Sequence, residues 1–434
     1  MWINWAGDQL CEPAAVERPA AVGEVVGAVE RAVAAGRGVR VAGSGHSFTA
    51  AALTDGTLLS LDRMGALLDV DPSSGLVRVE AGIRLHALSL ALAEHGLAMP
   101  NLGDIDEQSI AGAISTATHG TGVTLRNVSA QVRGLRMVTA RGTVVDVAGG
   151  EELLAARVAV GALGVITEVT LQTVPAFTLR GVDAPVALAE VLEGLEERVD
   201  AHRHFEFFVF PHADSALTRT NEVVDEPPRP RPHWRAWVDD ILLANRAFHL
   251  ACVIGRAFPP AIPSLNRLVT RLSGTSTRVD RSDRIFASPR LVRFTEMEYA
   301  LPRAVAADAV RAIKATAERY AINFPIEVRF VAPDDALLSP AHQRETVYIA
   351  VHAFKGMEWE PYFRAVEAIA DEHGGRPHWG KRHFQTAATL AQRYPEWDRF
   401  AGVRARIDPN GVFANAYTDR VLGTSRTAAR AAAN

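Results

Sequence analysis

A histidine directly behind two glycines is the first group in this sequence whose residue types suggest chemistry. Residues 41–49 read VAGSGHSFT, so Gly43, Ser44 and Gly45 form a turn after a short apolar run. Glycine-bearing turns let backbone N–H groups approach a phosphate, because no side chain blocks the way. A phosphate cradle does not need His46, but a neutral imidazole is a nucleophile toward an electrophilic carbon. The turn can therefore bind a ligand, react with it, or be a plain tight turn.

Two other segments of small residues favour a ligand over a plain turn. SIAGAISTATHGTG occupies residues 109–122 and GALG occupies 161–164, both within the first 176 residues. Three such loops can converge on the pyrophosphate of one long dinucleotide. The pattern is not a Rossmann fingerprint, because Phe48 stands where the third glycine belongs, nor a P-loop. A flavin nucleotide also offers His46 an electrophilic carbon, the methyl group at position 8α.

A carboxylate and a guanidinium stand two residues apart in the second half of the chain. Glu327 and Arg329 lie within the predicted strand FPIEVRFVAPDD, where alternate side chains point to the same face. The alternative is an exposed ion pair of small energetic value, which the apolar flanking residues argue against. Lys381 in HWGK is either a surface lysine or a site residue. His352 shares a predicted strand face with Tyr348 and is either a core histidine or a site residue.

The composition is that of a globular protein with material for two domains. The chain has 434 residues, of which 48% are hydrophobic and 22% charged. A net charge of −4 argues against nucleic-acid binding. Two cysteines cannot form a disulfide framework, and the histidine pairs lack carboxylates at convincing spacing, so we expect no metal site. Without a signal peptide or an apolar run of about 18 residues, a cytoplasmic location is expected, with peripheral membrane contact left open.

Periodicity predicts an α+β chain with a change of character near residue 176. We expect helices over 21–36, 84–95, 186–200, 236–254 and 304–320. Hairpins are expected at residues 67–82 and 132–147, and later strands at HFEFFVFP, EMEYALPR, FPIEVRFVAPDD and TVYIAVHAF. The proline-rich segment 224–234 is expected to be an exposed loop.

Several of these motifs together resemble a known family over nearly the whole chain, from about Trp5 to Gly423. VAGSGHSFT, SIAGAISTATHGTG and GALGVITEVT resemble the FAD-binding domain of the vanillyl-alcohol oxidase superfamily. FPIEVRFVAPDDALLSP, TVYIAVHAF and RPHWGKRHF resemble the aldonolactone oxidoreductases, in particular the actinobacterial lactone dehydrogenases. The resemblance implies a two-domain flavoprotein: a PCMH-type FAD domain over 1–176, an inserted cap domain with an antiparallel sheet over 177–375, a return segment over 376–423 and a disordered tail over 424–434.

The resemblance also implies site residues and a reaction. FAD is expected to be attached covalently through His46. The expected cofactor-binding residues are Gly43, Ser44, Gly45, His46, Ser47, Ser109, Gly112, Ala117, Thr118, His119, Gly120 and Ile166. Glu327 is expected to orient substrate hydroxyls, Arg329 to stabilise negative charge on the reduced flavin, and Lys381 and His352 to complete the catalytic set.

The implied reaction is oxidation of an aldono-1,4-lactone such as L-gulono-1,4-lactone at C2, giving L-ascorbate or an analogue. An alditol or carbohydrate oxidase on the same scaffold is the alternative. Alditol-oxidising relatives place a threonine two residues after the histidine, where this chain has Phe354. The electron acceptor is a cytochrome, a dye or oxygen. Ala117 and Thr118 are the small residues expected near the flavin ring, where oxygen access is decided.

Overall fold

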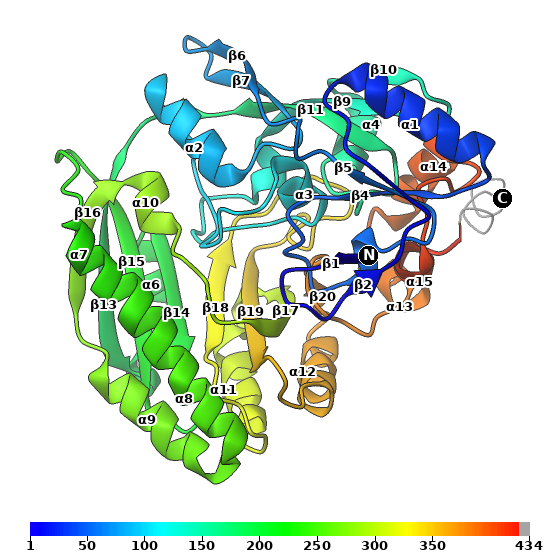
Figure 1. Ribbon diagram of the computed structural model, residues 1–434. Helices are drawn as coiled ribbons and strands as arrows, with labels where there is room; N and C mark the ends of the chain where they lie inside the picture. Colours follow the sequence, from blue (N-terminus) through cyan, green and yellow to red (C-terminus); the bar gives the residue numbers. More distant parts are fainter. Residues whose placement is uncertain (425–434) are drawn as a thin grey trace.

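An antiparallel sheet of eight strands dominates one half of the molecule in the computed structural model, which describes residues 1–424 (Figure 1). The expected strands of the second half all belong to it. In sheet order the strands are β16 (Ser276–Arg281), β13 (Thr178–Ala187), β15 (Ser215–Val224), β14 (His204–Val209), β18 (Ile326–Val331), β19 (Thr346–Phe354), β17 (Phe294–Pro302) and β20 (Arg376–Pro377).

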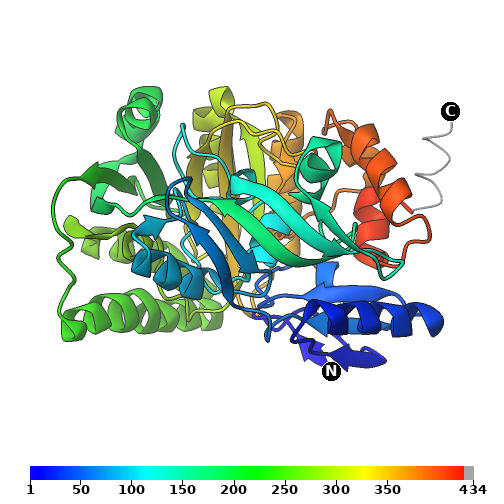
Figure 2. The same ribbon diagram turned by 90° about the horizontal axis from the view of Figure 1, so that it is seen from above.

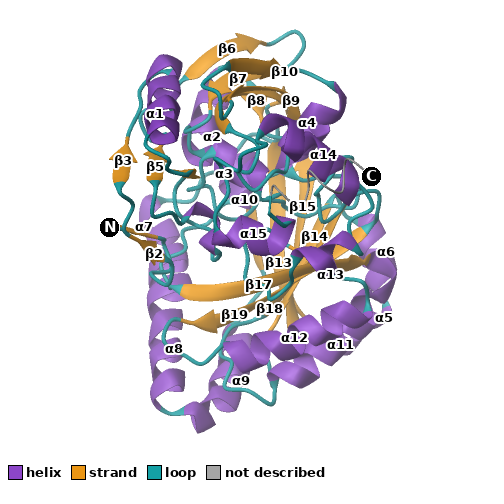
Figure 3. Cartoon of the chain, turned by 90° about the vertical axis from the view of Figure 1, so that its right-hand side faces the viewer, coloured by secondary structure: helices purple, strands orange, loops and turns teal. Residues whose placement is uncertain are grey.

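Helices cover both faces of this sheet (Figure 3). On one face, apolar strand residues form a core with α5 (Leu188–Glu193), α6 (Leu195–Ala201), α11 (Ala306–Ala317) and α12 (Glu360–Glu372). On the other face lie α7 (His233–Ala236), the π-helical segment η3 (Trp237–Ala247), α8 (Phe248–Ala257) and α9 (Ile262–Leu272) (Figure 1). The helix expected over 186–200 is two helices, since Gly194 separates α5 from α6.

The first part of the chain contributes two smaller sheets. A parallel sheet has the order β3 (Ala15–Glu17), β5 (Thr57–Ser60) and β4 (Val39–Ala42). An antiparallel sheet has the order β10 (Val144–Val147), β9 (Val132–Val138), β11 (Val165–Gln172), β7 (Leu76–Glu80) and β6 (Leu67–Asp71), which confirms both predicted hairpins. Their helices are α1 (Val22–Ala34), α2 (Leu85–Glu94) and α4 (Gly150–Ala156). The small-residue segment 109–122 holds one short helix, α3 (Ile110–Ser115).

The C-terminal segment returns to the first part of the chain (Figure 2). Residues of α13 (Ala387–Ala391), α14 (Trp397–Ile407) and α15 (Ala416–Leu422) share one apolar cluster with α1 and the sheets of the first part. That cluster also takes in Leu179, Ile285, Phe286 and residues 336–338, while the strands of the large sheet and α5, α6, α11 and α12 form a second cluster. The division near residue 176 stays a prediction, since a smaller apolar cluster joins Phe48 of the first part to Phe354 of β19. The tail expected over 424–434 lies outside the described residues, except for Thr424.

Two further features bear on the expectations from composition. Among residues 1–424, no helix is long and apolar enough to cross a membrane. Cys11 and Cys252 are free thiols; Cys11 is partly exposed, whereas Cys252 is buried in an apolar cluster. Burial raises the pKa of the Cys252 thiol to about 12.

The tight approach of Gly82 to the turn after β5 provides a test of the fold. A methyl group on Gly82 would overlap the Leu61 carbonyl oxygen and lie 2.7 Å from that of Met64. Because neither backbone oxygen can move like a side chain, we expect Gly82→Ala to lower the free energy of unfolding by about 2 kcal/mol or more. Thermal and urea unfolding measure this loss.

Gly23→Ala is the matched control. Gly23 lies in α1 with nothing within 4 Å of the added methyl group. Alanine is the better helix former by about 0.8–1.0 kcal/mol, so this variant should be neutral or slightly stabilised. Equal stability of the two variants would contradict the close packing at Gly82.

Candidate active site

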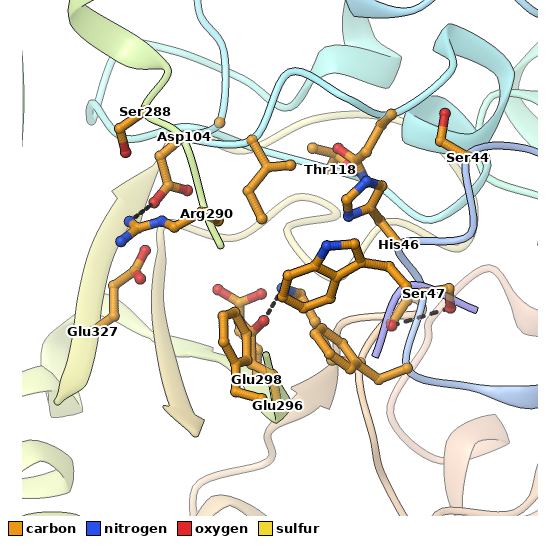
Figure 4. Close-up of a pocket in the computed structure, with 18 of the residues that line it drawn as sticks. Ser44, His46, Ser47, Asp104, Thr118, Ser288, Arg290, Glu296, Glu298 and Glu327 are labelled. Carbon is orange, nitrogen blue, oxygen red and sulfur yellow. Dashed lines mark hydrogen bonds and ion pairs between the residues drawn. The ribbon is translucent and has the colours of Figure 1, made fainter. Parts of the chain in front are cut away.

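One cavity of about 1550 Å³ connects the predicted cofactor loops to the charged face of the large sheet. Its walls include the 43–47 loop, the start of α3 with its flanking residues, and residues 160–166 on one side, and side chains of β17, β18 and β19 on the other. Figure 4 shows His46 approaching this space from one side, with Glu296, Glu298 and Glu327 across from it. Its volume exceeds the roughly 300–1,000 Å³ of ordinary small-molecule pockets.

The 43–47 loop is held by two distant segments. From the N-terminal segment, the Trp5 N–H donates to the Gly45 carbonyl (2.8 Å) and the Asn4 side-chain amide donates to the Ser47 carbonyl (3.0 Å). From the HWGK segment, the Gly380 carbonyl accepts hydrogen bonds from the Phe48 N–H (2.8 Å) and the Ser47 hydroxyl (3.1 Å). These bonds fix the loop from outside and leave its inner side toward the cavity.

The loop fits the pyrophosphate of a dinucleotide. Gly45 has φ of +74°, a conformation that favours glycine, and a methyl group on Gly43 would lie 2.5 Å from the Ser109 hydroxyl oxygen. Within residues 1–424, the amides of residues 44–47 donate none of the backbone or side-chain hydrogen bonds. Donors facing a cavity without side chains in the way are what a phosphate requires.

His46 is placed as a neutral imidazole. Its ring stacks on Trp5, with centroids 5.6 Å apart and an interplanar angle of 27°. Burial lowers the pKa of His46 to about 4, so the ring carries no proton charge at neutral pH. An uncharged imidazole in the cavity wall keeps the nucleophilic nitrogen lone pair that covalent attachment requires.

Most of the predicted cofactor residues line this cavity. They are Gly43, Ser44, Gly45, His46, Ser47, Ser109, Gly112, Thr118, His119 and Ile166. Ala117 and Gly120 do not, which differs from the expectation. Ala117 is fully buried in the apolar cluster of the first part, with φ of 60°. Gly120 allows close packing on residues 101–102, since a methyl group there would overlap the Leu102 carbonyl oxygen.

The pleat of the large sheet sorts charged from apolar residues. Along β18, Ile326, Val328 and Phe330 point into the helix-covered core, while Glu327 and Arg329 line the cavity. Neighbouring strands follow the same alternation. Glu296 and Glu298 of β17 and His352 of β19 line the cavity, and Glu296 lies directly opposite His352 in the strand register. Phe354, by contrast, packs in a small apolar cluster with Phe324.

Three carboxylates surround the guanidinium of Arg329. Its Nη2 lies 3.0 Å from Asp104 Oδ1, and its Nε lies 2.7 Å from Glu206 Oε2 and 2.5 Å from Glu327 Oε1. These carboxylates raise the pKa of Arg329 well above its usual value, although burial opposes the charge. Arg329 is therefore a fixed cation in a buried acidic setting.

Among residues 1–424, Glu327 is the only one of these three carboxylates without a second arginine partner. Asp104 also pairs with Arg290, and Glu206 also lies 3.3 Å from Arg219 Nη1. Burial raises the pKa of Glu327 to about 7; Arg329 counters this rise, and Asp104 and Glu206 add to it. A carboxyl group that titrates near neutral pH can hold or release a proton under working conditions.

Lys381 and His352 meet at Glu296. The Lys381 ammonium forms an ion pair with Glu296, whose carboxylate also lies 3.5 Å from His352 Nε2. His352 Nδ1 is 3.1 Å from the Pro325 carbonyl oxygen, which fixes the ring. Although burial opposes it, the Glu296 charge raises the pKa of His352. Lys381, His352 and the Glu327–Arg329 pair therefore share one wall of the cavity.

His119 belongs to a second buried pair. Its Nε2 lies 3.2 Å from Glu298 Oε1, and its ring stacks on Tyr348 with centroids 3.7 Å apart. Contact with His119 lowers the pKa of Glu298 well below its usual value despite burial. His378, whose Nδ1 accepts the Gly380 N–H at 3.0 Å, lies beside this pair. One ligand atom of each of His119, Glu298 and His378 lies within 4.8 Å of the others, a grouping that the sequence patterns did not suggest.

Four acidic and basic groups of this wall were missed from the sequence: Asp104, Arg290, Glu296 and Glu298. The two glutamates carry a usable signal, because EME within an apolar strand repeats the spacing of Glu327 and Arg329. Asp104 and Arg290 lie 186 residues apart, and neither is part of a regular element. No local pattern brings them together.

The fold is that of FAD-dependent oxidoreductases of the vanillyl-alcohol oxidase type. It matches a solvent-stable cholesterol oxidase with a TM-score of 0.82 over 98% of this chain and 97% of the other, at 19% identity. Residues 13–148 match the FAD binding domain family. Residues 169–421 match the D-arabinono-1,4-lactone oxidase family, and the chain belongs to this family.

Relatives of known name cover almost the whole chain. The sequence is 53% identical to L-gulono-1,4-lactone dehydrogenase of Mycobacterium tuberculosis, over 98% of this chain and 99% of the relative. It is 34% identical to L-gulonolactone oxidase of Bos taurus, over 96% and 97%. It is 33% identical to an alditol oxidase of a Streptomyces species, over 96% and 98%.

Removing the charge of Asp104 should lower the pKa of Glu327. The negative charge of Asp104 raises the pKa of Glu327, and without that charge Arg329 has one carboxylate partner fewer besides Glu327. In Asp104→Asn we expect the titration of Glu327 to move to lower pH by on the order of one unit. Infrared difference spectroscopy of the carboxyl band against pH measures it directly.

Asp106→Asn is the control from the same loop. Asp106 pairs with His86 at 3.1 Å and does not line the cavity. This variant should leave the Glu327 titration in place. A shift of the same size in both variants would contradict the proposed coupling through Arg329.

Proposed function

We propose that the protein is a FAD-dependent dehydrogenase that oxidises the C2 hydroxyl of an aldono-1,4-lactone, with L-gulono-1,4-lactone as the model substrate. The observation that carries this proposal is that Glu327, Arg329 and Lys381 line the same cavity as the 43–47 loop. The names of the mycobacterial and bovine relatives supply the substrate class.

The residues that would hold FAD are those of the three small-residue loops. The 43–47 amides would take the pyrophosphate, His46 would attach the ring system covalently, and Ser109, Thr118 and Ile166 would contact it. When bound, FAD supplies the acceptor for the hydride equivalent that leaves the alcohol carbon. Arg329, charged at every working pH, would stabilise the negative charge that this transfer leaves on the cofactor.

The electrostatics suit a neutral, hydroxylated substrate. Arg329, Lys381 and Arg290 each already have a carboxylate partner, so no free cation remains among them to demand a substrate carboxylate. Glu327, with a pKa raised to about 7, would accept the C2 hydroxyl proton while the hydrogen on C2 leaves. The 2-keto product of L-gulono-1,4-lactone enolises to L-ascorbate.

A linear alditol is the weaker candidate. Phe354, which replaces the threonine of alditol-oxidising relatives, is buried in an apolar cluster away from the cavity wall. It offers no hydroxyl partner to a longer polyol. Turnover of alditols above that of lactones in a substrate panel would reverse this preference.

The ionisation of Glu327 should set the pH profile. Below about pH 7 the Glu327 carboxyl group is protonated and cannot accept the proton of the substrate hydroxyl. Therefore kcat/KM for the lactone should rise with pH through about 7. In Glu327→Gln we expect kcat to fall by a factor of about 10²–10⁴ and the rising limb to disappear. FAD content, measured by absorbance, should stay unchanged. A variant that retains both turnover and the limb would exclude this role.

Covalent attachment through His46 is testable on denatured protein. After acid precipitation, flavin colour should remain with the wild-type pellet and appear in the supernatant for His46→Ala. Trp5→Phe keeps an aromatic ring beside His46 and should retain the bond. Colour lost from the wild-type pellet would refute attachment without touching the proposed reaction.

A further inference from the structure

The cavity does not end at the Glu327–Arg329 pair. It continues between the large sheet and helices η3, α8 and α9, in a region called here the apolar arm. From η3 and α8, Leu243, Ala247 and Ala251 line it at intervals of four residues. From α9, Leu265, Leu268, Val269 and Leu272 line it at intervals of three and four. These spacings describe one face of each helix, so two apolar helix faces are turned toward open space.

The remaining walls of the arm carry apolar groups and ion pairs, together with Arg235 and Arg278. The sheet contributes Phe208 and Leu217. Of the charged side chains, Arg219 pairs with Asp183 at 2.6 Å and Arg231 pairs with Asp240 at 2.6 Å. Phe248 and Phe324, with centroids 4.9 Å apart, both line the cavity between the arm and His352. The apolar residues that η3, α8 and α9 contribute therefore favour an apolar group at this part of the wall.

The arm opens to solvent at a rim of leucines. Leu243, Leu268 and Leu272 line the cavity and are 56%, 51% and 76% exposed. Trp234 and Trp237, on the adjoining turns, are 70% and 47% exposed. Large apolar side chains gathered at the mouth of a cavity mark a site for an apolar ligand or surface, whereas single exposed ones carry no such meaning. Figure 1 shows these helices along the side of the molecule away from the C-terminal helices.

A sugar lactone does not account for the apolar arm, because the charged wall already offers hydrogen-bond partners for its hydroxyl groups. The proposed reaction, on which this inference rests, needs a second ligand that removes two electrons. We propose that the apolar arm admits a lipophilic quinone, whose ring reaches the site while its hydrocarbon tail lies between η3, α8 and α9. The cavity volume of about 1550 Å³ leaves room for such a ligand beside a dinucleotide and a lactone.

The transfer of electrons and protons from the lactone to the quinone balances without any other reactant. The lactone alcohol loses its C–H and O–H bonds and becomes a ketone, releasing two electrons and two protons. FAD, held by the three small-residue loops, would supply the relay for these two electrons between lactone and quinone. The quinone takes up the two electrons and two protons, and its two C=O groups become the two hydroxyl groups of the quinol.

The test uses holoenzyme that has been reduced anaerobically with dithionite, so it does not depend on the lactone. Reoxidation is followed by the return of flavin absorbance after mixing with a decyl-substituted benzoquinone, the same ring without the chain, or ferricyanide. We expect the decyl quinone to react about tenfold faster than its chainless analogue at equal low concentration. Equal rates for the two quinones, or faster reoxidation by dissolved oxygen, would overturn the proposal. Failure of lactone to bleach the flavin would refute only the proposed function.

Two variants locate the passage. Ala251→Phe fills the arm from α8 and should lower the decyl quinone rate about tenfold while leaving ferricyanide within about twofold. Leu268→Ser makes the rim polar without filling it and should weaken binding of the decyl quinone, measured independently by quenching of tryptophan fluorescence. Leu250→Ser is the control, because Leu250 is 59% exposed on α8 but does not line the cavity. Quinone rates and binding that stay unchanged in both Ala251→Phe and Leu268→Ser would overturn the proposal.

Discussion

The two-residue period of one antiparallel sheet places all the charged groups that its strands contribute to the cavity wall. Glu327 and Arg329 on β18, Glu296 and Glu298 on β17 and His352 on β19 all occupy positions of the same face, because the strand register aligns them. The residues between them, such as Val328 and Met297, form the core under α11 and α12. A slip of one residue would move the carboxylates into that core and the apolar side chains into the cavity. The same strand register therefore determines both the packing of the core and the geometry of the site.

The carboxylates around Arg329 differ in their other partners, and this difference bears on the chemistry of Glu327. Arg329 pairs with three carboxylates, two of which have further arginine partners, and burial raises the pKa of the third, Glu327, to about 7. Burial makes this possible, because an exposed carboxylate would be ionised by solvent whatever its neighbours. The cation and the titrating acid lie two residues apart on one strand. The fold therefore supplies a permanent charge and a proton acceptor within 2.5 Å of each other.

Local sequence patterns were sufficient for most of the elements and for part of the site, although the helix expected over 186–200 is two helices. Alternation predicted both hairpins and placed Glu327 with Arg329, and the glycine turns marked the loops that line the cavity. Asp104 and Arg290 could not be found this way, since their pairing depends on how two irregular segments meet. Ala117 shows the opposite error. Its neighbours line the cavity, but its positive φ turns its own methyl group into the core. Motif spacing predicts which segment forms a wall, not which side chain of that segment faces inward.

The contrast between the two thiols has a practical use. Cys252 is sealed inside the protein with a pKa raised to about 12, whereas Cys11 is partly exposed on β2 (Leu10–Cys11). A maleimide reagent will therefore couple to a single point near the N-terminus, on a strand that pairs with β1 (Trp2–Ile3). If the protein is attached to an electrode through Cys11, every molecule will have the same orientation on the surface. A layer of uniformly oriented molecules suits an electrochemical sensor for sugar lactones.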